Sequence, residues 1–512
     1  MHSESLMRPA PAGRMKRFFQ SEGYLFLLLV FLLSYFTYFH NYQFPPHVFW
    51  DENYHIASAQ KYLNGVYFME QHPPLGKLLI ALGEKMLNRN PSDAEFIGTD
   101  YATNFSDEFS FAGYRFFPAL LAWLTAPLLY FIFLLLTKRP LWAALLSFFY
   151  IFDNALIVHL RGAMLESTLI FFMALTLLLF LLLPRLRERA DQFSAAALWF
   201  GIALAAVFAT KLLGLVTVLF VPVLFWQLRG DRGLILRLLF WGGLGFLVMY
   251  IAVWQVHFSL GRTINPVLPD QGLYQASPAY KEILTQGKTH SLLNFPVMWK
   301  DSINFVSHYN RGTPRLDLCK PDENGSPFFF WPIGARSINY RWETPNSQAY
   351  RYLYLQSNPA VWWTAFLGVL IAISLIVSSL FGEVQRFKRP LLLLTFLGVY
   401  GAYMVAISRI DRVMYLYHYF TPLFLSFIIF GLVFLEIEHI AGWALTEMRK
   451  SIVLLCIGAF IFTGFQVYRP FTYYEPILDS QVTRRAFFPY WELHCVNCPK
   501  RSLLVVPRPA LP

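Results

Sequence analysis

The chain has 512 residues, of which 56% are hydrophobic, 18% are aromatic and only 14% are charged, and its formal net charge is +11. Soluble globular domains carry about 25% charged and about 45–50% apolar residues, so this composition excludes an ordinary cytosolic enzyme and a disordered chain. The apolar residues stand in blocks of about the 20 residues that a bilayer crossing needs. The sequence therefore predicts an all-α polytopic membrane protein.

Apolar segments along the chain predict about eleven transmembrane helices. Their expected bounds are 23–40, 114–137, 141–159, 166–184, 195–210, 212–228, 234–256, 360–380, 390–408, 413–435 and 451–468. The first segment follows Arg14, Lys16 and Arg17, as a signal peptide would. No small-residue cleavage site comes after it, so we expect a retained helix.

Short basic turns between these helices predict the orientation. Cytoplasmic loops carry an excess of Lys and Arg, and with a cytoplasmic N-terminus every short basic turn falls on that side. These turns hold Lys138/Arg139, Arg185/Arg187/Arg189, Arg229/Arg232/Arg237, Arg386/Lys388/Arg389 and Arg449/Lys450. We therefore expect an odd number of spans and an extracytoplasmic C-terminus.

The same count divides the chain into four regions. Residues 1–256 form an N-terminal transmembrane region that includes an outer loop at 41–113, and residues 257–359 form a second outer loop. Residues 360–468 form a region of four transmembrane helices, and residues 469–512 form an outer tail. Loops of this length are usually functional, so we expect the chemistry on the outer face.

Two adjacent carboxylates, Asp51 and Glu52, follow the first span directly. Burial of neighbouring carboxyl groups raises their pKa values, which makes one of them a candidate general base near neutral pH. The alternative is structural: Asp51 caps a helix that runs to about Leu63, and Glu52 occupies its first turn. The residues alone leave both interpretations open.

Four cations stand at the outer ends of predicted spans, where the orientation rule disfavours them: Arg161, Lys211, Arg409 and Arg412. Charges at such positions are costly in lipid and usually face a cavity or an anion. Their position beside the carboxylate pair predicts a phosphate site. The alternative is that they pair with Glu166 and Asp411 to hold helices together.

Two further basic groups belong to this prediction. Lys77 follows two prolines at the start of an apolar helix, and His418 lies a little deeper in the tenth span, between two tyrosines. A cavity with carboxylates and cations at the membrane boundary suits group transfer from a lipid-linked donor. It would also suit a secondary transporter or a lipid flippase, but related halves with broken helices, which are typical of transporters, are not evident in the sequence.

Six segments resemble, in order, conserved motifs of the protein O-mannosyltransferase family, whose members have the polytopic GT-C glycosyltransferase fold. They are Asp51–Leu79 (DENYHIASAQKYLNGVYFMEQHPPLGKLL), Phe152–Thr168, Ala209–Leu215, Val256–Phe258, Ser357–Trp363 and Arg412–Pro422. The chain departs from the family at Tyr54, Glu70 and Glu166. Its second outer loop is also short for the β-trefoil repeats of eukaryotic members, so the resemblance indicates a prokaryotic-type member in a bacterial plasma membrane.

The resemblance implies an inverting transfer of mannose from a polyprenyl phosphate to Ser/Thr hydroxyls of proteins outside the membrane. Asp51 would be the general base, and Glu52 would orient the acceptor or tune Asp51. The donor phosphate would be bound by Arg161, Lys211 and Arg412, with Lys77, Arg409 and His418 secondary. Acceptor or sugar would be contacted by His72, Glu166, Tyr417 and Tyr419.

The expected partners are the lipid-linked sugar, membrane lipid and a protein acceptor. We expect no obligatory metal, no other obligatory cofactor and no nucleic acid. The alternative among enzymes is a GT-C transferase that moves another sugar to a lipid or polysaccharide acceptor. On the outer tail, Cys495 and Cys498 form a CVNC motif that predicts a local disulfide rather than a zinc site, because no second ligand pair has suitable spacing.

Overall fold

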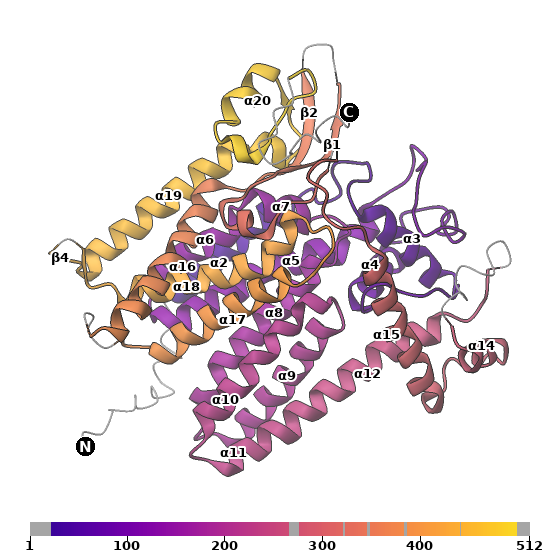
Figure 1. The fold of residues 1–512 in the computed structure, drawn as a ribbon, viewed down its shortest axis with the longest axis horizontal. Helices are drawn as coiled ribbons and strands as arrows, with labels where there is room; N and C mark the ends of the chain where they lie inside the picture. Colours follow the sequence, from indigo (N-terminus) through magenta and orange to yellow (C-terminus); the bar gives the residue numbers. More distant parts are fainter. Residues whose placement is uncertain are drawn as a thin grey trace, which may run out of the picture.

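The computed structural model describes residues 22–265, 276–320, 323–345, 349–382, 387–440 and 442–498. The N-terminal basic residues Arg14, Lys16 and Arg17, as well as Arg386 and the last part of the outer tail, lie outside these ranges. The described chain is mostly helical, and long antiparallel helices occupy the centre of the molecule (Figure 1).

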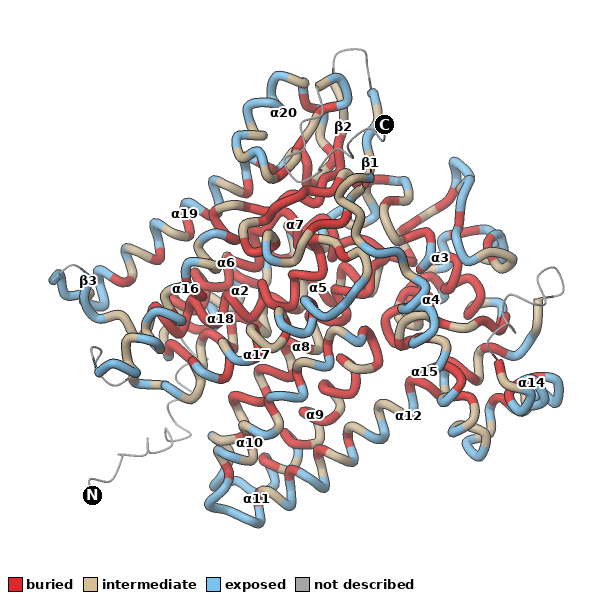
Figure 2. The backbone as a smooth tube through the Cα atoms, viewed as in Figure 1, coloured by how far each residue is buried: buried red, intermediate tan, exposed pale blue. Residues whose placement is uncertain are grey.

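Nine helices of the described chain are long and apolar enough to cross a membrane. They are α2 with η1 (Glu22–Ser34, Tyr35–Phe39), α5 (Ala112–Thr137), α8 with η2 (Glu166–Leu182, Leu183–Leu186), α9 (Ala190–Phe208), α11 with η4 and α12 (Arg232–Arg237, Leu238–Gly242, Gly243–Leu260), α16 (Pro359–Leu380), α17 (Pro390–Ser408), η7 with α18 (Leu416–Tyr419, Phe420–Glu436) and α19 (Glu447–Thr472). They match nine of the eleven predicted spans within a few residues. α18 is the most enclosed, whereas α2, α12 and α19 keep most of their sides exposed, as lipid-facing helices do (Figure 2).

The other two predicted spans differ from simple helices. The segment predicted at 141–159 is the pair α6 (Pro140–Ile151) and α7 (Asn154–Leu160), which are bent by 65°. Asp153 causes the restart, because its side chain accepts the Leu156 N–H at 2.8 Å and so caps α7. The segment predicted at 212–228 is η3 (Leu212–Leu219) followed by α10 (Phe220–Leu228), and it is too short to count as a full span.

The segments between the spans carry most of the remaining structure, and they add a few short strands to the predicted helical membrane fold. Strands β1 (Ile338–Glu343), β2 (Tyr350–Leu355) and β5 (Pro476–Ile477) form an antiparallel sheet that joins the second outer loop to the tail. Strands β3 (His439–Ile440) and β4 (Trp443–Ala444) form a small hairpin between α18 and α19. The short helices are α3 (Glu52–Leu63), α4 (Leu75–Leu87), α14 (Pro278–Thr285), η5 (Leu292–Asn294), α15 (Phe295–Gly312), η6 (Phe328–Ile333), α20 (Asp479–Arg485) and η8 (Pro489–Trp491).

Basic turns that the sequence places on one side of the membrane do gather at one end of the bundle. Arg139 forms an ion pair with Glu447, and Lys388 forms one with Glu438. Arg185 donates to the Leu135 carbonyl at 2.9 Å. The strands β1 and β2 and the helices α3, α4 and α20 lie at the opposite end (Figure 1).

Candidate active site

Asp51 stands immediately before α3, but its carboxylate does not cap that helix. The backbone carbonyl of Asp51 accepts the N–H groups of Tyr54 and His55 at 3.1 and 3.3 Å, whereas no capping hydrogen bond to the side chain is recorded. Instead, Tyr417 donates its hydroxyl to Asp51 Oδ2 at 3.3 Å. The helix runs to Leu63, as the structural alternative expects, yet the carboxylate points into a polar cluster.

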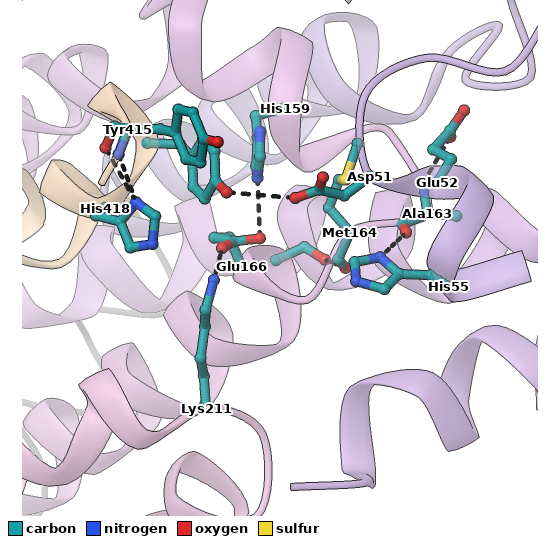
Figure 3. A network of polar contacts seen from close by, with 12 residues as sticks. Asp51, Glu52, His55, His159, Ala163, Met164, Glu166, Lys211, Tyr415 and His418 are labelled. Carbon is teal, nitrogen blue, oxygen red and sulfur yellow. Dashed lines mark hydrogen bonds and ion pairs between the residues drawn. The ribbon is translucent and has the colours of Figure 1, made fainter. Parts of the chain in front are cut away.

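That cluster is a chain of buried polar groups centred on Glu166, the first residue of α8. Lys211 Nζ forms an ion pair with Glu166 Oε1, and His159 Nε2 lies 2.9 Å from Glu166 Oε2 (Figure 3). The other ring nitrogen of His159 lies 2.6 Å from the Tyr340 hydroxyl. Lys211 reaches this position because α9 ends at Phe208 and residue 211 adopts an extended conformation before η3.

Aromatic side chains enclose the same cluster. Trp50 stacks on Tyr340 with ring centroids 4.9 Å apart and meets the edge of Tyr415 at 5.3 Å. The Lys211 ammonium lies 5.3 Å from the centre of the Tyr417 ring. Tyr340 occupies a register shift between Asn339 and Arg341 in the β1–β2 pair, and such bulges redirect a side chain. The outer sheet thereby contributes directly to the site.

Burial and nearby charges shift the pKa values of Asp51 and His72. Burial raises the pKa of Asp51 above its ordinary value, Lys211 acts in the opposite direction, and the negative charge of Glu166 adds to the rise. Burial and the positive charge of Lys211 lower the pKa of His72 well below its ordinary value, with a smaller contribution from Arg412. Arg412 is partly exposed, as are Asp51 and His72. The cluster therefore combines a carboxylate of raised pKa with the buried cation Lys211, and Arg412 lies partly exposed nearby.

Glu52 lies outside this cluster, although it follows Asp51 in sequence. Its carboxylate accepts the Nε and Nη2 groups of Arg115 at 2.6 and 2.7 Å, the Ala163 N–H at 2.8 Å and the Phe49 N–H at 3.1 Å. Glu52 and Arg115 are completely buried. A Cβ atom at position 162 would come within 2.8 Å of the Phe49 ring, so this close packing needs Gly162. Glu52 thus fixes the loop before α3 and has no free oxygen for an acceptor.

Lys77 is likewise occupied. Its ammonium is buried and lies 2.7 Å from Glu70 Oε1 and 3.0 Å from Ser58 Oγ. Glu70 stands directly before the Gln-His-Pro-Pro segment, and it is one of the residues at which the chain departs from the family pattern. A buried ion pair of this kind cannot release one partner without a large cost, so Lys77 is held close to the loop that carries Glu70.

Three other expected site residues also lie elsewhere. Arg161 Nη2 donates to the carbonyls of His40 and Asn41 at 3.1 and 2.6 Å, in a separate cavity beside α19. Arg409 is exposed at the end of α17. Tyr419 is buried between helices, where its hydroxyl lies 2.9 Å from that of Tyr400.

His418 lies at the margin of the cluster. Its Nδ1 accepts the Tyr415 N–H at 3.1 Å, and its ring stacks on Tyr417 with centroids 4.5 Å apart. Asp411, which the structural alternative offered as a partner for the cations, pairs instead with Arg315 at 2.6 Å. Lys211 and Glu166 do form the ion pair that the structural alternative expects.

Two sequence profiles of one family match most of the chain. A profile described as dolichyl-phosphate-mannose-protein mannosyltransferase matches residues 28–260, and one described as the C-terminal four-transmembrane region of protein O-mannosyltransferase matches residues 298–491. The chain belongs to the protein O-mannosyltransferase family. The family resemblance inferred from the six motifs is thereby confirmed.

Relatives in this family match part of their length. Protein O-mannosyltransferase 1 of Drosophila pseudoobscura pseudoobscura is 30% identical over 270 residues, which are 49% of this chain and 29% of the relative. Dolichyl-phosphate-mannose–protein mannosyltransferase 1 of Candida albicans is 29% identical over 280 residues, which are 51% of this chain and 31% of the relative. These alignments thus span less than a third of either relative.

The fold agrees with a solved structure of the family over nearly the whole chain. A chain in the structure of the Saccharomyces cerevisiae Pmt1–Pmt2 complex bound to the sugar donor superposes with a TM-score of 0.80 at 15% identity. The superposition covers 94% of this chain and 95% of that one. The chain therefore has the GT-C fold that the resemblance implied.

Five of the six family motifs meet in two groups, which share the motif at Phe152–Thr168. Asp51, Glu166, Lys211 and Tyr417 come from four motifs and form the cluster described above. The motif at Ser357–Trp363 packs on the one at Phe152–Thr168, because the Trp362 indole N–H donates to Asp153 Oδ2 at 2.7 Å. In the part of the chain that the structure describes, no three His, Cys, Asp or Glu side chains are arranged to hold a metal ion.

Sequence reasoning missed three residues of the site and its support, namely Arg115, His159 and Tyr340. Arg115 and His159 are polar residues at the ends of predicted spans, a signal that would have found them. Tyr340 gave no such signal, because only a strand bulge brings it to the cluster. On the outer tail, the predicted local disulfide between Cys495 and Cys498 is present.

Proposed function

We propose that this chain transfers mannose from a polyprenyl-phosphate carrier to Ser/Thr hydroxyls of proteins, on the side of the membrane where Asp51 lies. The observation that carries the proposal is the Asp51 carboxylate, which makes no cap to its helix and lies near Lys211 among aromatic side chains, while Arg412 acts on the neighbouring His72. The basic turns at the opposite end of the bundle support a cytoplasmic position for that end. The proposal includes a prokaryotic plasma membrane as the location.

Asp51 is the general base in this reaction. It accepts the proton of the acceptor hydroxyl as the oxygen attacks the anomeric carbon, and the bond from that carbon to the carrier phosphate breaks with inversion. The raised pKa of Asp51 suits a base that works near neutral pH. Glu52 acts indirectly, because its contacts with Arg115 and Ala163 fix the loop that carries Asp51.

Lys211 and Arg412 bind the carrier phosphate and stabilise the negative charge that grows on it. An ammonium has three N–H donors, and Glu166 accepts from one of them, so Lys211 retains donors for a phosphate oxygen. Tyr417 donates to Asp51, and the charges of Lys211 and Arg412 act on His72, so these two side chains would contact the sugar or the acceptor. His418 is a secondary contact at the margin.

Transfer of radiolabelled mannose from polyprenyl-phosphate mannose to a Ser/Thr-rich peptide tests the base. Removal of a general base costs about 10²–10⁴-fold in rate, so Asp51→Asn should lose transfer by this factor while retaining donor binding. The matched control is Asp107→Asn, which changes an exposed carboxylate of the same outer loop. Transfer by Asp51→Asn near the wild-type rate would rule out Asp51 as the base.

Donor affinity tests the phosphate site independently of the chemistry. A hydrogen bond to a charged group contributes about 1.5–3 kcal/mol, so Lys211→Met or Arg412→Met should weaken binding of the donor by roughly 10- to 150-fold. Arg412→Lys should recover part of the loss, because a point charge does not reproduce the bidentate guanidinium. If Lys211 only closes the ion pair with Glu166, Lys211→Met would lower the melting temperature and leave donor affinity unchanged.

A further inference from the structure

A cavity of about 470 Å³ lies between the end of α2–η1 and the end of α19, apart from the proposed active site. Its wall is apolar and includes Leu33, Phe36, Phe462 and Phe465, and its polar end is formed around Arg161. None of Asp51, Glu166, Lys211 or Arg412 lines it. Neither the family comparisons nor the proposed reaction accounts for this space.

Arg161 is the feature that points to a ligand. Its side chain is buried, and it is anchored by two carbonyl groups and by the Tyr473 ring, whose centre lies 5.0 Å from the guanidinium carbon. Its Nε atom is buried and has no hydrogen-bond partner among the described residues. A buried donor without a partner is costly, and a buried guanidinium is a strong binder of phosphate oxygens.

The charges at the polar end leave one positive charge uncompensated. Arg469 also lines the cavity, but it pairs with Glu475 at 3.0 Å. Within the ranges that the structure describes, no ion pair of Arg161 is recorded, and His40 adds a further polar group at the rim. The cavity therefore favours a group with a single negative charge over a neutral one.

The position of the cavity indicates that the ligand is an amphiphile. Both helices that frame it are candidate membrane spans with most of their sides exposed, and Phe36 and Phe462 are 59% and 44% exposed. The polar end lies where these spans end, at the level at which lipid head groups meet the hydrocarbon. A ligand that entered from the bilayer would place its head group at Arg161 and its first carbons against the phenylalanine side chains.

We propose that this cavity binds the phosphate head group of a membrane amphiphile through Arg161, at a site separate from the one that binds the sugar donor. Two sources share this chemistry: an anionic phospholipid of the surrounding bilayer, and a polyprenyl phosphate. The assignment does not depend on the transfer reaction. It also gives Arg161 a role different from the donor contact that the sequence suggested.

Native mass spectrometry of the full-length protein tests the proposal with three probes: phosphatidylglycerol, undecaprenyl phosphate and diacylglycerol, which lacks phosphate. Arg161→Met should weaken binding of at least one phosphate lipid by about 10-fold, the effect of losing one charge-assisted contact. Lys211→Met should leave that binding event unchanged, and diacylglycerol should not occupy the site. The probe that responds to Arg161→Met identifies the source.

Because Arg161→Met removes a buried anchor and could impair folding, a surface variant provides a second test. Gln466 is exposed on α19 and lines the cavity, so Gln466→Glu should repel the phosphate and weaken binding to a similar degree. The control Gln466→Met introduces no charge, so it should leave phosphate-lipid binding unchanged.

Three results would overturn the proposal. The first is phosphate-lipid binding that is insensitive to both Arg161→Met and Gln466→Glu. The second is diacylglycerol binding as strong as that of the phosphate lipids. The third is an equal loss of sugar-donor binding in Arg161→Met and Lys211→Met, which would place Arg161 in the donor site.

Discussion

The buried ion pair of Glu52 with Arg115 allows a quantitative prediction about the loop that carries Asp51. Arg115 donates to both oxygens of Glu52 and to the carbonyls of Gln43, Pro45 and His47, at 2.6–2.7 Å. Replacement by Met keeps an extended side chain but leaves the Glu52 carboxylate buried without a counter-ion. Breaking a buried pair from one side costs about 3–5 kcal/mol, which corresponds to at least roughly 10²-fold in the folding equilibrium.

A double-mutant cycle isolates this interaction. The free energy of unfolding is measured in mixed micelles for Glu52→Gln, Arg115→Met and the double variant. We expect the double variant to lose less than the sum of the two single losses, by about 0.5–3 kcal/mol, because the second substitution removes a group that the first left unpaired. Arg311→Met, at an exposed position, is the control and should change stability by no more than about 0.5 kcal/mol. Additive losses, or an Arg115→Met effect as small as the control, would refute the argument.

Further predictions concern the reaction and the topology. Burial raises the pKa of Asp51 and Lys211 lowers it, so transfer should fall on acidification through that raised pKa. Lys211→Met should therefore move the acidic limb of the kcat/KM profile to higher pH. An unchanged limb would contradict Asp51 as the base. Tyr340→Phe removes a hydrogen bond to the histidine of the cluster, worth about 0.5–1.5 kcal/mol, and should slow transfer by roughly 2- to 12-fold with little change in melting temperature. Reporter fusions at Asn310 should lie outside and fusions at Arg187 inside; two fusions on the same side would require a different span count.

The membrane fold was largely predictable because its main determinant is local. A run of apolar residues is readable without knowledge of its neighbours, and nine spans match the helices found. The side-chain partners of Asp153 and Lys211 were not readable from the sequence, since each lies far along the chain. Asp153 is bound by Trp362, 209 residues away, and Lys211 by Glu166, 45 residues away.

The candidate site was predictable in its residue types and less so in its pairings. The sequence indicates that cations at the membrane boundary need anions, but not which anion each one finds. Lys77 forms an ion pair with Glu70, and Glu52 forms one with Arg115, and the sequence indicated neither pairing. Burial makes an unpaired charge costly, so buried charges are usually paired. Asp51 and Arg412 are partly exposed, and Lys211 retains N–H donors beyond its ion pair with Glu166, so these groups remain available to a ligand.

Charge conservation explains why a lysine between two carboxylates suits the proposed reaction. Asp51 begins as an anion and ends protonated, while the carrier phosphate gains one negative charge as its bond to the sugar breaks. The net charge of the site stays constant, and negative charge moves from the carboxylate to the phosphate. Lys211, held by Glu166 and acting on Asp51, can stabilise both ends of this movement without being displaced. A fixed cation in a water-poor site stabilises the developing charge with little reorganisation, and the ion pair with Glu166 is what fixes it.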